Sequence, residues 1–176
     1  MVENTTAWVF AYGSLMWNPG FEYLEEHPAL LQGYHRAFCI FSHVYRGSEE
    51  KPGLVLGLDQ GGSCKGRAFC ISEEREAEVL AYLDGRELVT GVYARHYLPI
   101  EVPSGKVLAH AYVANTAHPQ YAGKVAPEKA AELIAERIGP AGTNREYFEN
   151  TINHLDALGI QDRDLLQIRE ILRSLL

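Results

Sequence analysis

The sequence predicts an α+β fold, because strand-like runs fill its first two thirds and amphipathic helices fill its last third. The strand-like runs are short and rich in β-branched and aromatic residues, and residues 92–102 alternate between apolar and other side chains with a period of two. After residue 126 the apolar residues recur at helical spacing. A chain of 176 residues without repeats or long linkers is expected to form one domain over residues 1–176.

Strands are predicted at six places along the chain: 8–12, 37–42, 54–58, 66–71, 92–102 and 107–114. The runs 54–58 and 66–71 are separated by a segment rich in glycine and polar residues, a pattern typical of a β-hairpin with a long loop. Ser104 and Gly105 indicate a turn that pairs the last two strands. Pro99 marks an edge or a bulge, since proline cannot donate to a sheet.

Helices are predicted from residue 73 to about 86, from 127 to 138, from 144 to 158 and after 162. Ser72 and Asp162 are expected to act as N-caps, and Thr143 with Glu146 forms a capping-box pattern. If the first helix continues through Gly85, residue 87 lies on the same face as the apolar positions 80 and 83.

Composition excludes several classes of protein. Hydrophobic residues make up 47% and charged residues 22%, a balance that a disordered or collagen-like chain does not have. A net charge of −7 disfavours binding to nucleic acid or to an anionic membrane surface. No apolar run reaches the ~20 residues of a membrane span, and the first six residues lack a basic signal-peptide start. Three cysteines without a CxxC pair favour a reducing, cytoplasmic location.

The strong motifs for nucleotide or zinc chemistry are missing from the sequence, including the P-loop, GxGxxG after a strand, HExxH and GxSxG. Of the seven histidines, His96 and His110 lie on adjacent predicted strands and could face one another. The others are dispersed, so structural or exposed histidines are the preferred interpretation and no metal site is expected.

A cysteine nucleophile is a weaker alternative. Cys39 and Cys70 lie in apolar strand runs, where a free cysteine usually behaves as a small buried hydrophobe. Cys64 follows a glycine-rich turn, but no neighbouring base or helix N-terminus lowers the pKa of its thiol. A thiol-dependent hydrolase would require a reactive Cys that these positions do not indicate.

Two other features could carry chemistry. Gly13 and Ser14 follow an apolar strand, and consecutive N–H groups in such a turn can form an anion-binding nest, although many Gly-Ser turns are only turns. Glu87, on the apolar side of a helix end, would be partly desolvated, which raises the pKa of a carboxyl group toward the range useful for proton transfer. The alternative is that Glu87 is a solvated charge at a fraying terminus.

Five stretches together resemble the ChaC-like branch of the γ-glutamylcyclotransferases. They are VFAYGSLMWNPGF at 9–21, GYHR at 33–36, RG at 46–47 with KPGLVLGL at 51–58, YLDGRE at 82–87 and GPAGTNREY at 139–147. The resemblance runs from about residue 8 to the final helix, nearly the whole chain. It implies a small mixed β-barrel flanked by helices.

The resemblance also implies an activity: cleavage of glutathione in the cytosol into 5-oxoproline and cysteinylglycine, without a cofactor or metal. Glu87 matches the family's catalytic glutamate. The residues that match substrate-binding positions are Val9, Phe10, Ala11, Tyr12, Gly13, Ser14, Leu15 and Tyr147. The sequence departs from the family at Ala11, where relatives often have glycine, and at Gly85, which replaces a bulkier residue and is expected to loosen the segment carrying Glu87.

In the implied reaction the substrate's own α-amine attacks its γ-carbonyl, and Glu87 acts as general base and then general acid. The turn at 12–15 would bind either the α-carboxylate or the developing oxyanion, and the sequence leaves both open. Two alternatives remain: a cyclotransferase for other γ-glutamyl amines or amino acids, and a non-catalytic small-molecule-binding domain. The acidic chain is expected to be a monomer that binds neither nucleic acid nor membranes.

Overall fold

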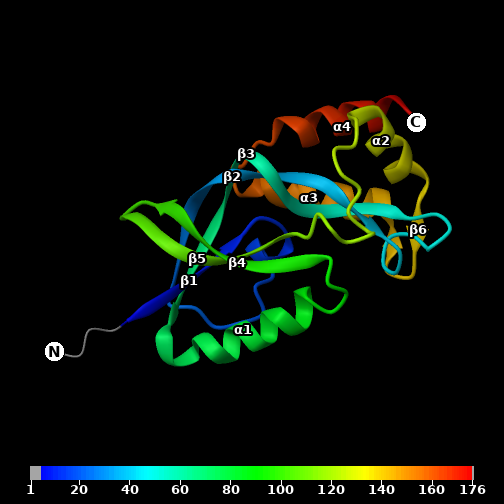
Figure 1. Cartoon of the computed structure of the whole chain (residues 1–176). Coiled ribbons are helices and arrows are strands. Elements are labelled where there is room, and N and C mark those ends of the chain that lie inside the picture. The colour runs from blue at the N-terminus through cyan, green and yellow to red at the C-terminus, as the bar shows by residue number, and fades with distance from the viewer. Residues whose placement is uncertain (1–4, 176) are drawn as a thin grey trace. The chain divides into compact units, whose positions relative to one another are not determined.

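The computed structural model describes residues 5–175 (Figure 1). Its elements are β1 (Thr6–Ala11), η1 (Ser14–Met16), β2 (Glu25–Ser42), β3 (Gly53–Ser72), α1 (Glu73–Glu87), β4 (Tyr93–Val102), β5 (Gly105–Ala114), α2 (Pro127–Glu136), β6 (Ile138–Gly139), β7 (Gly142–Thr143), α3 (Asn144–Ala157) and α4 (Arg163–Ser174). The described residues form two compact units. Unit 1 comprises those of Met1–His35 and Leu58–Asn115, and unit 2 those of Arg36–Gly57 and Thr116–Leu176. The single domain over 1–176 stays a prediction.

Unit 1 contains a closed barrel with the strand order β1-β3-β2-β4-β5. β1 is antiparallel to β3 and parallel to β5, where Val9 is paired with His110, so the barrel is mixed. β4 and β5 form an antiparallel hairpin closed at Val102 and Gly105, as the turn residues predict. The α+β class and the mixed barrel with flanking helices are thereby confirmed.

Apolar side chains from β1, β3 and α1 fill the core of unit 1. Phe10, Phe69 and Leu83 are at most 1% exposed. α1 contacts β1 and runs without interruption through Gly85 to Glu87, as the sequence predicts (Figure 1). Ser72 is the N-cap residue, with extended backbone angles, and three glutamates occupy the first turn of α1. Those carboxylates lie at the positive end of the helix dipole, which favours a helix start at this point.

The predicted hairpin of 54–58 with 66–71 is wrong, because both runs belong to the single strand β3. Gly61 and Gly62 adopt positive φ values of 100° and 68°, which bend the strand without reversing it. The carbonyl oxygen of Gly61 lies 2.9 Å from Nδ1 of His35, on the neighbouring strand β2. The predicted strand at 37–42 is likewise only the end of the longer strand β2.

Unit 2 is built around α2, α3 and α4, and α2 packs against both other helices. The capping predictions at Thr143 and Asp162 are confirmed: the Thr143 hydroxyl accepts from the N–H of Glu146, and the Asp162 carboxylate accepts from the N–H of Leu165. Ser72 is also an N-cap residue, but its side chain makes no capping hydrogen bond. The helix predicted to reach residue 138 instead ends at Glu136. Pro140 disfavours helical geometry at the residue before it, and Ile138 lies in β6, 69% exposed.

The structure also bears on membrane insertion. Over residues 5–175 every helix falls short of the length and apolarity that crossing a membrane requires.

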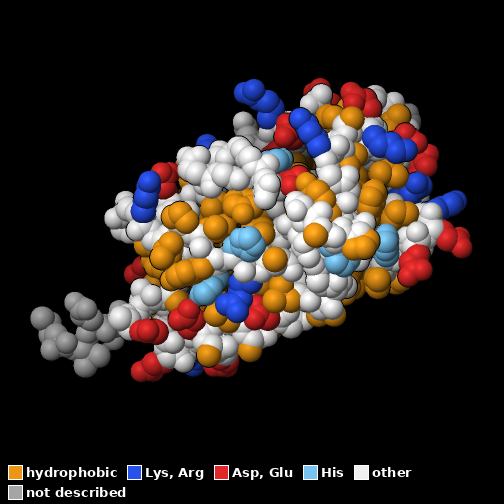
Figure 2. All heavy atoms as spheres, viewed as in Figure 1, with side chains coloured by type: hydrophobic (Ala, Val, Ile, Leu, Met, Phe, Trp, Pro, Cys, Tyr) orange, Lys and Arg blue, Asp and Glu red, His pale blue; other side chains and the backbone are white. Residues whose placement is uncertain are grey.

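The β4–β5 hairpin exposes part of its apolar surface: Tyr97 and Leu108 are about half exposed, at 55% and 49%. Hydrophobic and histidine side chains gather over these two strands in the space-filling view (Figure 2).

Candidate active site

Glu87 lies in the last turn of α1, four and eight residues after the buried apolar residues Leu83 and Val79. A spacing of four places it on the same face of the helix, as the sequence predicts from Leu83. Its side chain is 19% exposed. Burial raises the pKa of the Glu87 carboxyl above its ordinary value, and the neighbouring Arg86 cation opposes part of that rise. A carboxyl group with a raised pKa is suited to proton transfer near neutral pH.

The segment that matches substrate-binding positions begins in β1 and ends in η1. Six of its seven residues are buried: Val9, Phe10, Ala11, Tyr12, Gly13 and Leu15. Ser14, at the first position of η1, is exposed. In the first turn of a helix, the N–H groups point away from the helix and have no acceptor within it. Those of Ser14 and Leu15 occupy this position, which suits the predicted nest.

Gly13 has a φ of −135°, so the turn does not use the access of glycine to positive φ. Its carbonyl oxygen accepts a hydrogen bond from the N–H of Met16 at 2.9 Å, which closes the first turn of η1. Close approach of a ligand to the backbone remains the predicted reason for glycine at this position.

Arg86 connects this segment with Glu87 within unit 1. Its Nη2 donates to the hydroxyl oxygen of Ser14 at 3.0 Å, and its Nη1 donates to the carbonyl oxygen of Asn18 at 3.0 Å. Its Nε lies 3.5 Å from Oε1 of Glu87. The structure therefore brings Ser14 and Glu87 to one guanidinium group, which the sequence analysis did not predict.

A second polar cluster holds α1 one turn before Glu87. The phenol of Tyr112 on β5 donates to Oδ1 of Asp84 at 2.7 Å, and Nε of Arg95 on β4 lies 3.1 Å from the same oxygen. Burial and the Asp84 carboxylate raise the pKa of Tyr112 far above its ordinary value, so the phenol keeps its proton. In the sequence, this cluster is indicated only by Asp84, the acidic residue three positions before Glu87.

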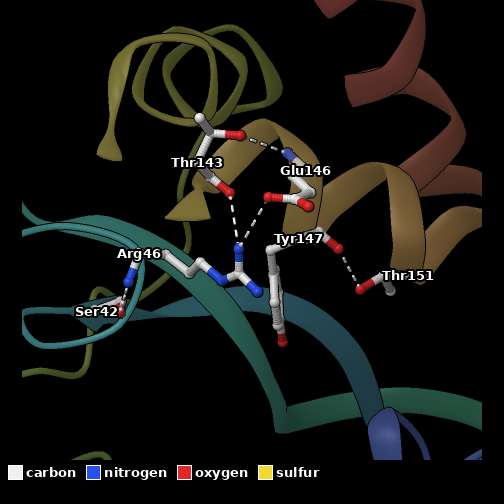
Figure 3. Close-up of polar contacts among 6 residues, drawn as sticks. All are labelled: Ser42, Arg46, Thr143, Glu146, Tyr147 and Thr151. Carbon is white, nitrogen blue, oxygen red and sulfur yellow. Dashed lines mark hydrogen bonds and ion pairs between the residues drawn. The ribbon is translucent and has the colours of Figure 1, made fainter. Parts of the chain in front are cut away.

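Tyr147 belongs to unit 2, where it lies in the first turn of α3 (Figure 3). Its hydroxyl accepts a hydrogen bond from the N–H of Leu56 at 3.2 Å. Its ring packs edge-on against Phe38, and the Arg46 guanidinium lies over it at 5.5 Å from the ring centroid. The Tyr147 ring is therefore packed, while its hydroxyl is hydrogen-bonded to the backbone of β3.

Arg46 is the other cationic side chain of this region. Its Nη1 donates to the carbonyl oxygen of Thr143 at 3.2 Å and lies 3.7 Å from the Glu146 carboxylate (Figure 3). Gly142 has a φ of 123°, and a Cβ at this position would collide with both charged groups. The motif at 139–147 thus contacts Arg46 through the Thr143 carbonyl oxygen and the Glu146 carboxylate, and Gly142 leaves room for both groups. Arg46 lies in a stretch that resembles the family, but the resemblance assigns no role to it.

The structure also tests the two alternative chemistries. His96 and His110 do not face one another across the hairpin, since His96 is paired with Ala111 and His110 with Tyr97. No group of three or more His, Cys, Asp or Glu side chains in residues 5–175 is arranged to hold a metal ion. None of Cys39, Cys64 and Cys70, which are all buried, forms a disulfide with another described residue, and burial raises the pKa of the Cys70 thiol. A raised pKa opposes formation of a thiolate nucleophile at Cys70.

Comparisons with known proteins place the chain in a family. The glutathione-specific γ-glutamylcyclotransferase of Escherichia coli is 36% identical over 175 residues, covering 99% of this chain and 76% of the relative. The human glutathione-specific γ-glutamylcyclotransferase 1 is 34% identical over 162 residues, covering 89% and 73%. A crystal structure of a yeast γ-glutamylcyclotransferase specific to glutathione shares the fold, with a TM-score of 0.83, 23% identity and 97% coverage of both chains.

The family called ChaC-like protein matches residues 7–175 of this sequence. That span includes β1, α1, the Arg86-Glu87 pair and the motif at 139–147. Together with the relatives, it shows that the chain belongs to the ChaC-like protein family.

Proposed function

We propose that this protein is a cofactor-independent γ-glutamylcyclotransferase that degrades glutathione to 5-oxoproline and cysteinylglycine. Its membership of the ChaC-like family and its relatives that are named glutathione-specific support the reaction and the substrate. The observation that carries the proposal is the partly buried carboxyl of Glu87, whose pKa is raised at the end of α1.

The reaction needs one group that both removes and returns a proton. The α-amine of the γ-glutamyl group is an ammonium ion that must lose a proton before its nitrogen attacks the γ-carbonyl carbon. A new C–N bond closes the five-membered lactam, the C–N bond to cysteine breaks, and the leaving amine takes up a proton. Glu87 would accept the first proton and donate it to the leaving nitrogen, so that the carboxylate is regenerated. The ring nitrogen loses a second proton after the attack, and the released amine takes up an equivalent proton from solvent to become an ammonium ion.

The remaining site residues would hold the substrate in the curled geometry that this attack requires. We assign the γ-glutamyl group to the segment from Val9 to Leu15, where the N–H groups at the start of η1 would bind the α-carboxylate or the oxyanion. We assign a second contact to the Tyr147 hydroxyl. That hydroxyl accepts from Leu56, and a hydroxyl can also donate to a ligand.

We further propose a cytoplasmic location, which three buried cysteines in the reduced thiol form support. A monomeric state and the lack of nucleic acid or membrane partners stay predictions. Independence from metals also stays a prediction, and a chelator tests it directly: activity should be unchanged after treatment with EDTA.

The test is product analysis with the purified protein. Glutathione, γ-glutamylalanine and a γ-glutamylamine are supplied separately, and 5-oxoproline and the released amine are quantified by chromatography with mass detection. We expect 5-oxoproline and cysteinylglycine in equal amounts from glutathione, and little product from the other two substrates. Equal turnover of γ-glutamylalanine would indicate the broader cyclotransferase. A folded protein that binds glutathione but releases no 5-oxoproline would indicate a non-catalytic binding domain.

A further inference from the structure

One guanidinium group in unit 1 contacts three separate parts of the candidate active site. Arg86 reaches the Ser14 hydroxyl with Nη2, the Asn18 carbonyl oxygen with Nη1 and the Glu87 carboxylate with Nε. Ser14 and Asn18 lie at the start of η1 and just beyond its end, while Arg86 and Glu87 lie in the last turn of α1. The side chain therefore spans two elements that are far apart in the sequence.

The geometry of these contacts suits arginine and not lysine. A guanidinium group offers donors from three nitrogens in one plane, so it can serve a hydroxyl, a carbonyl and a carboxylate at the same time. A lysine ammonium is a point charge on a flexible stem and does not reproduce this fork. The Arg86 side chain is 25% exposed and that of Glu87 19%, so the ion pair lies in a partly desolvated setting.

The titratable and charged groups around Glu87 come from three elements. On α1, the Arg86 cation opposes the rise of the Glu87 pKa that burial causes. On β5, Tyr112 keeps its proton, because burial, Asp84 and also Glu87 raise its pKa. Asp84, one turn earlier on α1, is paired with Arg95 of β4, so its charge is compensated. Arg86 is thus the cation that acts directly on Glu87.

We propose that Arg86 is a positioning residue, which fixes the Ser14 turn relative to the Glu87 carboxylate through its hydrogen bonds and its ion pair. The inference rests on the proposed function, because it assigns Arg86 a role toward the same acid/base group. It goes beyond that function, because it adds a residue that affects the reaction only through its contacts with Ser14 and Glu87. The positive charge of Arg86 and the planar arrangement of its donors are therefore expected to contribute separately to catalysis. Two substitutions at residue 86 can distinguish the two contributions.

The experiment compares Arg86→Lys, Arg86→Gln and Ser14→Ala with the wild type in 5-oxoproline release across pH. Arg86→Gln removes both the positive charge and the planar set of guanidinium donors. It should lower kcat by about ten- to a hundredfold and move the acid limb of the pH profile upward. Arg86→Lys keeps the charge, so the acid limb should stay in place while kcat falls. Arg75→Gln is the matched control, since Arg75 is an exposed arginine of the same helix that pairs with Glu22.

A double-mutant cycle tests the contact itself. If Arg86 acts through Ser14, the effects of Arg86→Gln and Ser14→Ala on kcat should be non-additive, because both changes break the same hydrogen bond. Fully additive effects, or wild-type kcat and an unmoved acid limb in folded Arg86→Gln, would overturn the proposal. Thermal melting of each variant shows that the fold is retained.

Failure of the proposed function has a different signature. If the wild type releases no 5-oxoproline, the pKa of Glu87 is followed instead by NMR of the ¹³C-labelled carboxyl group in wild type and Arg86→Gln. An upward shift of that pKa in Arg86→Gln, absent in Arg75→Gln, would support the role of Arg86 whatever the activity is. An unchanged pKa would overturn it.

Discussion

The phenol of Tyr112 donates a 2.7 Å hydrogen bond to the carboxylate of Asp84, three residues before Glu87 on the same helix. The bond ties α1 to β5, one of the two strands of the β4–β5 hairpin in unit 1. Arg95 of β4 contacts the same carboxylate oxygen and completes the attachment. The last turn of α1, and with it the candidate acid/base group, is therefore held by both strands of the hairpin.

Tyr112→Phe should lower the free energy of unfolding by roughly 1–2 kcal/mol, because it removes a buried hydrogen bond to a charged acceptor and keeps the aromatic packing. Urea denaturation monitored by circular dichroism measures the change. Tyr97→Phe serves as the control, since Tyr97 lies on the same hairpin but is 55% exposed. Equal stability losses in both variants would show that the Tyr112–Asp84 bond contributes nothing specific.

Glu87 predicts a pH-dependent contribution to stability. Its pKa in the folded protein is raised by burial, so protonated Glu87 favours the folded state. That contribution is fully present below the pKa of the unfolded chain and is lost as the pH rises through the folded pKa. Glu87→Gln stays neutral at all pH values, so it should be more stable than the wild type at neutral pH, and the difference should disappear in acid.

Melting temperatures of the wild type and Glu87→Gln between pH 4 and 8 measure this difference. Glu78→Gln, which changes an exposed glutamate of the same helix, is the matched control. A stability difference that stays constant over this range would contradict the raised pKa.

Tyr147→Phe should raise KM for glutathione, if the hydroxyl contacts the substrate. The same substitution should lower the free energy of unfolding by about 1 kcal/mol, because it removes the hydrogen bond from the N–H of Leu56 to the Tyr147 hydroxyl. Tyr147→Ala also removes the packing against Phe38 and Arg46 and should lower stability by roughly 2–4 kcal/mol. A wild-type KM in Tyr147→Phe would remove Tyr147 from the binding site and leave it a packing residue of α3.

Gly13→Val should abolish activity in a protein that still folds, if the substrate approaches the backbone at this turn. The expected reason is steric, because a valine side chain would block the close approach of a ligand, and a φ of −135° is not the positive value that favours glycine. Ser14→Ala should have a smaller effect on kcat/KM, about that of one hydrogen bond, ~1 kcal/mol. Melting temperature and 5-oxoproline release are measured for both variants. Full activity of folded Gly13→Val would show that no ligand approaches this turn.

The local elements of the site were predictable from the sequence. Glu87 lies four residues after Leu83, so the helical period alone placed it on the buried face of α1. The cap at Thr143 followed from a local hydrogen-bond pattern. Such features depend on residues within one or two turns, which the sequence shows directly.

Contacts between distant segments were not predictable. Arg86 and Ser14 are 72 residues apart, and no periodicity links them. The hairpin prediction failed at Gly61 and Gly62 because glycines in a polar segment indicate either a turn or a bend, and tertiary pairing with β2 selects the bend. The register of β4 and β5 likewise decided which residue His110 faces.

The most direct test of the account is the turnover of glutathione by Glu87→Gln. We expect a folded protein that still binds glutathione and releases 5-oxoproline about a hundredfold more slowly, or slower still, because it has lost its general acid/base group. Glu78→Gln should keep wild-type turnover. Near-wild-type release of 5-oxoproline by folded Glu87→Gln would contradict the assignment of Glu87 as the catalytic group.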